Sequence, residues 1–286
     1  MNYNFTFSKE WIDAFILRYS PNEIINFDNI YFHKKDHILK CQHFFNFTLS
    51  KKTLKSISEE INKENIIKFN YIDDLALLEQ LSIYFDQNDF KINVIDSWDA
   101  PRLILNSSIK NYLRYNKNYQ IRRNYKKYIE KKTQFIYRKS DDSNILDLWN
   151  DVLFIDFNSW KKQENSDMKS LEREDLQYLL FLMKKPQNIN LNVIYYNETP
   201  LAYSLMFKNQ SDNFWYSVKW GASYEGRKYY AGIFCLFNHL ENLYLKEKKL
   251  YIDFWGRRNN TYDLLKNDSI VRKHIEISKK VCKYEY

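Results

Sequence analysis

Glycine is nearly absent from this chain of 286 residues, and its four glycines all lie between Gly221 and Gly256. Glycine suits positions where the backbone turns sharply or must come close to another group. A chain that uses it so sparingly has to build its helices, strands and turns almost entirely from residues with side chains. We therefore expect the segment that keeps all four glycines to contain the close approach that a ligand requires.

The composition predicts a cytoplasmic protein that folds without disulfide bonds. Hydrophobic residues make up 44% of the chain and aromatic residues 18%, which is enough to fill a sizeable core. The three cysteines, Cys41, Cys235 and Cys282, are an odd number without paired spacing, and the first residues lack the pattern of a secretion signal. No apolar run is long enough to cross a bilayer, so we expect no membrane insertion.

Residue types that bind metals gather near the N-terminus, at His33, His37, Cys41 and His43. The alternating apolar pattern around them predicts strands, which would place the odd-numbered residues along one face without closing a tetrahedron. We therefore expect no metal.

Residues 106–132 carry the positive charge of the chain, whose net charge is +8. The segment holds nine lysines and arginines against a single acid, Glu130, and five tyrosines are interleaved with them. Two interpretations fit this pattern. The segment is either a solvated helix whose inner face is lined with tyrosines, or a surface that binds phosphate, nucleic acid or an acidic protein partner.

Apolar periodicity divides the chain into an α+β lobe at 1–105 and a second lobe at 106–286. In the first lobe a helix is expected to open at Asp73, and a strand is expected to break at Pro101. In the second lobe a basic helix, capped by Asn106 or Ser107, precedes a strand, two helical stretches, three strands, an amphipathic helix and a further strand. Their expected bounds after the basic helix are 134–138, 142–160, 170–185, 190–196, 201–208, 213–220, 233–249 and 250–254.

The start of the amphipathic helix offers a site for phosphate. The first N–H groups of a helix have no partner inside the helix and lie at the positive end of its dipole. Ala231 and Gly232 occupy this start, and their small size leaves room for a ligand. Taken alone the pattern is weak, because a glycine before a helix is more often part of an ordinary turn.

The order of these elements resembles the Gcn5-related N-acyltransferase (GNAT) superfamily over residues 106–280. Within it, the chain is most similar to the FemAB and CelD-like branch, in which a long basic helix precedes the catalytic lobe. Two departures stand out: Tyr262 is followed by Asp263 where the branch has lysine, and the phosphate loop lacks the usual arginine or glutamine pattern. The matching motifs are Tyr112-Leu113, Lys117, Gln120 to Tyr125, Trp160-Lys161, Thr199 to Ala202, Ala231-Gly232, and Asp253-Phe254-Trp255-Gly256 with Tyr262.

The resemblance implies a GNAT fold, a mixed and largely antiparallel sheet flanked by helices, with the N-terminal lobe as a degenerate second copy. It implies a bacterial N-acyltransferase in which an acceptor amine directly attacks the thioester of acyl-CoA or of acyl-phosphopantetheine. Asp253 is the candidate to accept the amine proton, and Tyr262 is the candidate general acid. The implied donor-binding residues are Lys219, Trp220, Gly226, Arg227, Lys228, Tyr230, Ala231, Gly232 and Lys266, and the implied acceptor-binding residues are Trp160, Lys161, Trp215, Arg257 and Arg258.

Other interpretations of these residues stay open. Asp253 fits equally well as a cap of the following turn, and Arg257 and Arg258 as a solvated loop. The donor is acyl-CoA, an acidic acyl carrier protein or a charged tRNA, and the acceptor is an amino sugar, an amino acid or a peptide. Two competing functions are a FemAB-like aminoacyl transferase that uses charged tRNA, and a nucleic-acid- or protein-binding module without catalysis. The sequence indicates no particular oligomeric state.

Overall fold

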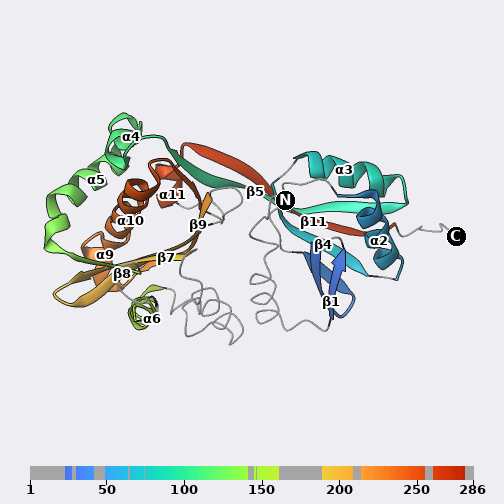
Figure 1. Ribbon diagram of the computed structural model, residues 1–286, viewed down its shortest axis with the longest axis horizontal. Coiled ribbons are helices and arrows are strands. Elements are labelled where there is room, and N and C mark those ends of the chain that lie inside the picture. Colours follow the sequence, from blue (N-terminus) through green and yellow to red (C-terminus); the bar gives the residue numbers. More distant parts are fainter. Residues whose placement is uncertain are drawn as a thin grey trace. The chain divides into compact units, whose positions relative to one another are not determined.

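The computed structural model describes residues 23–27, 30–41, 49–63, 65–73, 75–140, 145, 147–160, 189–208, 214–254 and 260–280. The chain forms two compact units (Figure 1). Unit 1 contains Ala100–Ser269, and unit 2 contains Phe5–Asp99 and Ile270–Tyr286. Two long strands, β5 (Phe90–Leu105) and β11 (Asp268–Lys279), begin in one unit and end in the other.

Unit 1 is built on a mixed sheet with the strand order β5-β10-β9-β8-β7-β6. Neighbouring strands are antiparallel except β9 and β10, which are parallel. A parallel pair needs a crossover connection, and helix α10 lies in the connection between these two strands. The remaining strands are β6 (Ile136–Lys139), β7 (Ile189–Tyr196), β8 (Thr199–Lys208), β9 (Phe214–Ala222) and β10 (Leu250–Asp253).

Helices cover both faces of the unit 1 sheet (Figure 1). Consecutive residues of a strand point to opposite faces. Two consecutive residues of β8 identify the helix that covers each face of the sheet. The Tyr203 hydroxyl donates to Asp156 of α6 at 2.7 Å, whereas Ser204 Oγ lies 2.9 Å from His239 Nδ1 of α10. The helices of unit 1 are α4 (Ile109–Tyr115), α5 (Tyr119–Lys131), α6 (Trp149–Phe157), α9 (Tyr224–Lys228), α10 (Ala231–Glu247) and α11 (Asn260–Leu265), and a short turn η2 (Lys132–Gln134) follows α5.

Helix α5 packs on α10 through buried tyrosines. The rings of Tyr125 and Tyr128 contact Phe237, and both hydroxyls donate to the carboxylate of Glu241, at 2.7 and 2.8 Å. Desolvation is the main reason that the pKa of both phenols lies above its usual value. The inner face of the basic segment is therefore lined with tyrosines, while most of its basic residues lie at exposed positions.

The basic segment forms two helices rather than one. Helix α4 begins after Ser108, whose hydroxyl accepts a hydrogen bond from a backbone N–H at 3.3 Å. Helix α5 begins after Asn118, whose side chain accepts from two backbone N–H groups. The caps predicted at Asn106 and Ser107 were wrong, because Ser108 is the residue in the capping conformation. Asparagine is a favoured N-cap, and Asn118 starts a second helix within the basic run.

The described elements of unit 2 repeat the order of unit 1 from β7 to β11, apart from the short helix α9. Its strand order is β1-β2-β3-β4-β11-β5, with β3 and β4 parallel and the β1–β2, β2–β3 and β4–β11 pairs antiparallel. Helix α2 connects β3 to β4 as α10 connects β9 to β10, and α3 follows β4 as α11 follows β10. The bounds are β1 (Glu23–Phe27), β2 (Ile30–Lys35), β3 (Ile38–Cys41), α2 (Lys51–Asn62), β4 (Ile66–Ile72) and α3 (Leu75–Asp86).

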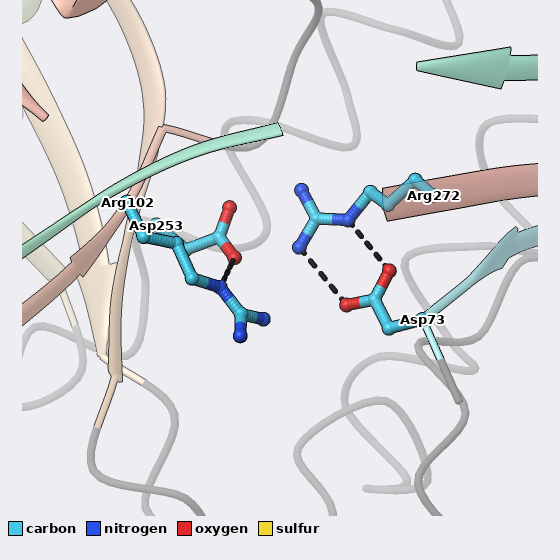
Figure 2. A network of polar contacts seen from close by, with 4 residues as sticks. All are labelled: Asp73, Arg102, Asp253 and Arg272. Atoms are coloured by element: carbon cyan, nitrogen blue, oxygen red, sulfur yellow. Dashed lines mark hydrogen bonds and ion pairs between the residues drawn. The ribbon is translucent and has the colours of Figure 1, made fainter. Parts of the chain in front are cut away.

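The same kind of ion pair lies at the end of the corresponding strand in each unit (Figure 2). In unit 1, Arg102 Nε of β5 donates to Asp253 Oδ2 at the end of β10, at 2.7 Å. In unit 2, Arg272 of β11 donates through Nε and Nη2 to Asp73, just after β4, at 2.8 and 3.1 Å. In both cases the arginine belongs to the strand that begins in the other unit, β5 for Arg102 and β11 for Arg272. The repeated position makes the ion pair part of the repeated fold.

The strands and the helix predicted between residues 190 and 254 are confirmed, with ends within about two residues, which is the usual uncertainty of such boundaries. The break predicted at Pro101 was wrong, because β5 continues through it to Leu105. The Pro101 carbonyl accepts from the Phe254 N–H at 3.1 Å. The helix predicted at 170–185 lies outside the described residues. Among the helices that the structure describes, none is long and apolar enough to cross a membrane.

Candidate active site

Strands β9 and β10 separate in the middle of the unit 1 sheet. They pair in parallel only over Phe214–Tyr216, opposite Tyr251–Asp253. Strand β10 ends there, whereas β9 continues to Ala222. From Ser217 onward, the edge of β9 that faces away from β8 therefore has no strand partner among the described residues. Such an edge presents backbone N–H and C=O groups that can pair with an extended ligand.

A β-bulge lies at the point of separation. Leu205 of β8 pairs with Lys219, whereas the next residue, Met206, pairs with Ser217, so Val218 is the extra residue. A bulge leaves the backbone of its extra residue outside the ladder and turns the strand locally. It also changes which side chains share a face. Ser217 and Trp220, which are three residues apart, both contact Tyr262.

Helix α10 begins beside this part of β9. Its N-cap residue, Tyr230, is in the left-handed conformation, with φ of 59°, and its side chain makes no capping hydrogen bond. The first N–H groups of α10 therefore receive no cap from this side chain. A Cβ atom on Gly232 would lie 3.1 Å from the Trp220 ring and 3.3 Å from Ala222 Cβ. Gly232 thus lets the helix pack closely on β9, with Trp220 against its first turn.

Basic residues of α5 lie near the start of α10. The ammonium group of Lys127 lies 4.1 Å from the centre of the Tyr230 ring. Lys127 is the main cause of a lowered pKa of the Tyr230 phenol, and Arg123 and Lys131 add to the effect. Arg227, at the end of the short helix α9, is exposed nearby in the sequence. Positive side chains and free helix N–H groups together favour an anion such as phosphate.

Tyr262 of α11 lies against the separated strands. It is 5% exposed, stacks on Phe254 with ring centres 4.1 Å apart, and its hydroxyl is 3.1 Å from Ser217 Oγ. Desolvation raises the pKa of its phenol well above the usual value, although hydrogen bonds to Ser217 and Trp220 partly oppose this. The hydroxyl therefore stays protonated at neutral pH and can donate a hydrogen bond.

Asp253 is fully buried, and its carboxylate accepts the hydrogen bond from Arg102. A carboxylate held by a guanidinium is stabilised in its charged form. The position of Asp253 at the end of β10 agrees with the sequence prediction, while its partner favours an anchoring role over proton transfer.

Lys219, on the opposite face of β9, pairs with the buried carboxylate of Asp156 in α6. Lys219 Nζ is 3.4 Å from Asp156 Oδ2, and Asp156 also accepts from Tyr203. Because Lys219 and Trp220 are consecutive strand residues, they point to opposite faces of the sheet. Lys219 is therefore on the α6 side, away from Trp220 and the start of α10.

The structure brings together only part of the predicted site. Trp220, Ala231, Gly232 and Tyr262 lie around the separated strands, with Tyr230 at the start of α10. Of the other predicted residues, Gly226 packs on the Leu201 carbonyl, Lys228 pairs with Glu225 and Lys266 pairs with Asp263. Trp215 is buried in β9, and Trp160, which follows α6, is 39% exposed. Lys161, Arg257 and Arg258 lie outside the described residues.

Four residues of the site were not predicted from the sequence as site residues. Arg123 and Lys127 belong to the basic segment, whose charge was noted, but nothing in the sequence places them beside Tyr230. Ser217 and Val218 gave no signal, because a bulge is visible only in the pairing of β8 and β9. The grouping of ligand-type residues near His33 forms no metal cluster within the described residues.

Comparisons with known proteins support the fold. No family model matches the chain, and no curated protein matches its sequence. The structure is similar to that of FemX, with a TM-score of 0.64 and 11% identity over 96% of this chain and 92% of FemX. It is also similar to a conserved protein of unknown function from Bacteroides thetaiotaomicron, with a TM-score of 0.64 and 11% identity over 96% and 91% of the two chains.

A third similar structure is that of L-PGS from Bacillus licheniformis, with a TM-score of 0.59 and 12% identity over 96% and 93% of the two chains. These likenesses show that the chain shares the fold of FemX and L-PGS, which confirms the predicted FemAB-like fold. At such low identity they carry information on the fold alone.

Asp253→Asn should lower the free energy of unfolding by about 3 kcal/mol or more, because it leaves Arg102 partly buried without its carboxylate. The double variant Arg102→Met/Asp253→Asn should recover most of this loss. Urea unfolding followed by circular dichroism measures both. An Asp253→Asn variant that keeps full stability but loses turnover would instead identify Asp253 as a proton acceptor.

Proposed function

We propose that this chain is a cytoplasmic N-acyltransferase that moves an acyl group from a thioester carrier to an amine. The observation that carries the proposal is the separation of β9 from β10 at a bulge, next to the uncapped start of α10. An extended pantetheine arm carries amide groups that can pair with the backbone of β9 along the edge that faces away from β8. Phosphates at the far end of the same carrier suit the start of α10.

The charges around α10 agree with a phosphorylated carrier. Lys127, Arg123 and Lys131 of α5 act together on Tyr230, as the lowered pKa of its phenol reflects. A carrier that runs from these side chains along β9 would bring its thioester toward Val218 and Tyr262. We take coenzyme A or the phosphopantetheine of an acidic carrier protein as the donor, and an amino sugar, an amino acid or a peptide as the acceptor.

The chemistry needs few groups from the protein. The acceptor nitrogen attacks the thioester carbon, a C–N bond forms, and the C–S bond breaks. The amine proton goes to water, and the backbone N–H of the bulge residue Val218 is the candidate donor to the oxyanion. The leaving thiolate needs a hydrogen-bond donor, and Tyr262 fits that role with Ser217 beside it.

The raised pKa of Tyr262 limits its role. A phenol is a poorer proton donor the further its pKa lies above that of the thiol that leaves, near 8.5 for an ordinary thiol. Complete proton transfer from Tyr262 would therefore run uphill. We assign Tyr262 a hydrogen bond that stabilises the developing thiolate, with the final proton coming from solvent.

A second function is aminoacyl transfer from a charged tRNA. The observation that favours it is the row of exposed basic residues along α4 and α5, which would suit a nucleic-acid backbone. The structure is also similar to the C-terminal domain of a protein named as a putative lysylphosphatidylglycerol synthetase from Agrobacterium fabrum. The TM-score is 0.59, with 7% identity over 90% of this chain and 83% of that chain.

Tyr262→Phe should lower kcat on the order of tenfold and leave the KM for the donor unchanged, because the ring and its stacking on Phe254 are kept. The matched control is Tyr251→Phe, which removes a hydroxyl from the neighbouring strand β10 and should leave both constants as they are. Steady-state kinetics with acetyl-CoA and an amine acceptor measure both constants for the two variants and the parent protein. Equal kcat values for Tyr262→Phe and the parent protein would remove Tyr262 from the mechanism.

Acetyl-CoA, long-chain acyl-CoA and free coenzyme A should raise the melting temperature by a few degrees at saturation, because ligand binding stabilises the folded state by mass action. Arg123→Gln/Lys127→Gln should reduce this rise, whereas the control variant Lys110→Gln should not. Thermal-shift assays at two salt concentrations, with bulk tRNA as a further ligand, measure it. A rise with tRNA alone, steeply weakened by salt, would favour aminoacyl transfer and contradict the use of coenzyme A.

A further inference from the structure

A groove of about 800 Å³ lies between α4 and the end of α11, within unit 1. Arg114, Tyr115 and Lys117 line it from α4 and the turn that follows, and Lys266 and Asn267 line it from the residues after α11. Pockets of this size hold ligands such as nucleotides and cofactors. The residues used for the donor, at the start of α10 and along β9, are not among those that line the groove.

The groove is positively charged. Arg114, Lys117 and Lys266 line it, and none of its lining residues is acidic. Lys266 pairs with Asp263 at 3.1 Å, whereas neither Arg114 nor Lys117 pairs with an acid within the described ranges. Two cations without a counterion repel each other, and a bound anion would relieve that repulsion.

The walls of the groove are held together by hydrogen bonds. The Tyr112 hydroxyl donates to the Leu265 carbonyl at 2.7 Å and accepts from Asn116 Nδ2 at 3.2 Å. The side chain of Asn267 pairs with both the N–H and the C=O of Ile104 in β5, at 2.8 and 2.7 Å. These contacts fix both α4 and β5 to the end of α11, so the groove exists before any ligand arrives and binding needs little ordering of the backbone.

The aromatic ring of Tyr115 lines the groove beside Arg114. Tyr115 is 79% exposed, and its ring centre lies 5.7 Å from the Arg114 guanidinium. An exposed tyrosine next to arginine offers a flat surface on which a nucleobase can stack, while the guanidinium forms paired hydrogen bonds to phosphate.

We propose that this groove binds a nucleoside diphosphate group, free or as part of a larger molecule. Arg114 and Lys117 hold the phosphates, Lys266 adds positive charge, and Tyr115 stacks on the base. The site goes beyond the acyl transfer proposed above, since it does not depend on which carrier brings the acyl group.

Isothermal titration calorimetry with ADP, UDP and inorganic pyrophosphate tests the proposal on the full chain. All three ligands should bind, and Arg114→Gln/Lys117→Gln should weaken each at least about tenfold, a loss of 1.4 kcal/mol. The matched control Lys110→Gln/Lys126→Gln removes two exposed charges from α4 and α5 outside the groove and should change affinity by less than about twofold. Absence of binding to the parent protein, or equal losses in the two double variants, would overturn the proposal.

Coenzyme A itself contains an ADP group, so ADP could bind at the donor site instead. The variant Arg123→Gln/Lys127→Gln separates the two sites. It removes two positive charges of α5 beside the start of α10 and leaves the residues of the groove unchanged. ADP should bind this variant as tightly as the parent protein. Loss of ADP binding in this variant, with binding kept in Arg114→Gln/Lys117→Gln, would overturn the groove as the ADP site.

The aromatic part of the site has its own test. Tyr115→Ala should weaken ADP and UDP several-fold, because base stacking on an aromatic ring contributes on the order of 1–3 kcal/mol, and it should leave pyrophosphate unchanged. Equal affinities of the parent protein and Tyr115→Ala for ADP would show that the groove recognises phosphate alone and would overturn its assignment to a nucleoside diphosphate.

Discussion

The ion pair between Arg102 and Asp253 fixes the point at which β10 ends, and the site depends on that point. Asp253 is fully buried, so its charge requires the arginine beside it. The pair joins the end of β10 to β5, and β9 continues beyond the three residues that pair with β10. The equivalent pair Arg272–Asp73 lies in the same place in unit 2. The same kind of arginine–aspartate pair thus joins β5 to β10 in unit 1 and β11 to the end of β4 in unit 2.

The scarcity of glycine shapes the site in a second way. An added Cβ at Gly226 would lie 2.3 Å from the Leu201 carbonyl oxygen, and one at Gly232 would lie 3.1 Å from the Trp220 ring. Left-handed positions are instead taken by other residues, including Tyr230 and Lys248 at the two ends of α10. Gly226 and Gly232 thus let α9 and α10 pack closely on β8 and β9, while residues with side chains occupy the strained left-handed positions.

Local patterns in the sequence predicted much of unit 1. The alternating residues of β7, β8 and β9 and the apolar spacing of α10 each reflect a buried face, and the order of these elements led to the GNAT fold. The bulge at Val218, the passage of β5 and β11 from one unit to the other, and the approach of Lys127 to Tyr230 depend on contacts between distant residues. No local pattern encodes those contacts, so Ser217 and Lys127 were not recognised as site residues.

Backbone hydrogen exchange with and without saturating acetyl-CoA tests the central claim most directly, since it reports which N–H groups the donor covers. We predict slower exchange at Ser217 to Ala222 of β9 and at Ala231 to Phe234 of α10, with little change in unit 2. Binding of acetyl-CoA that leaves exchange in both segments unchanged would contradict the account, because the donor would then lie away from the separated strands.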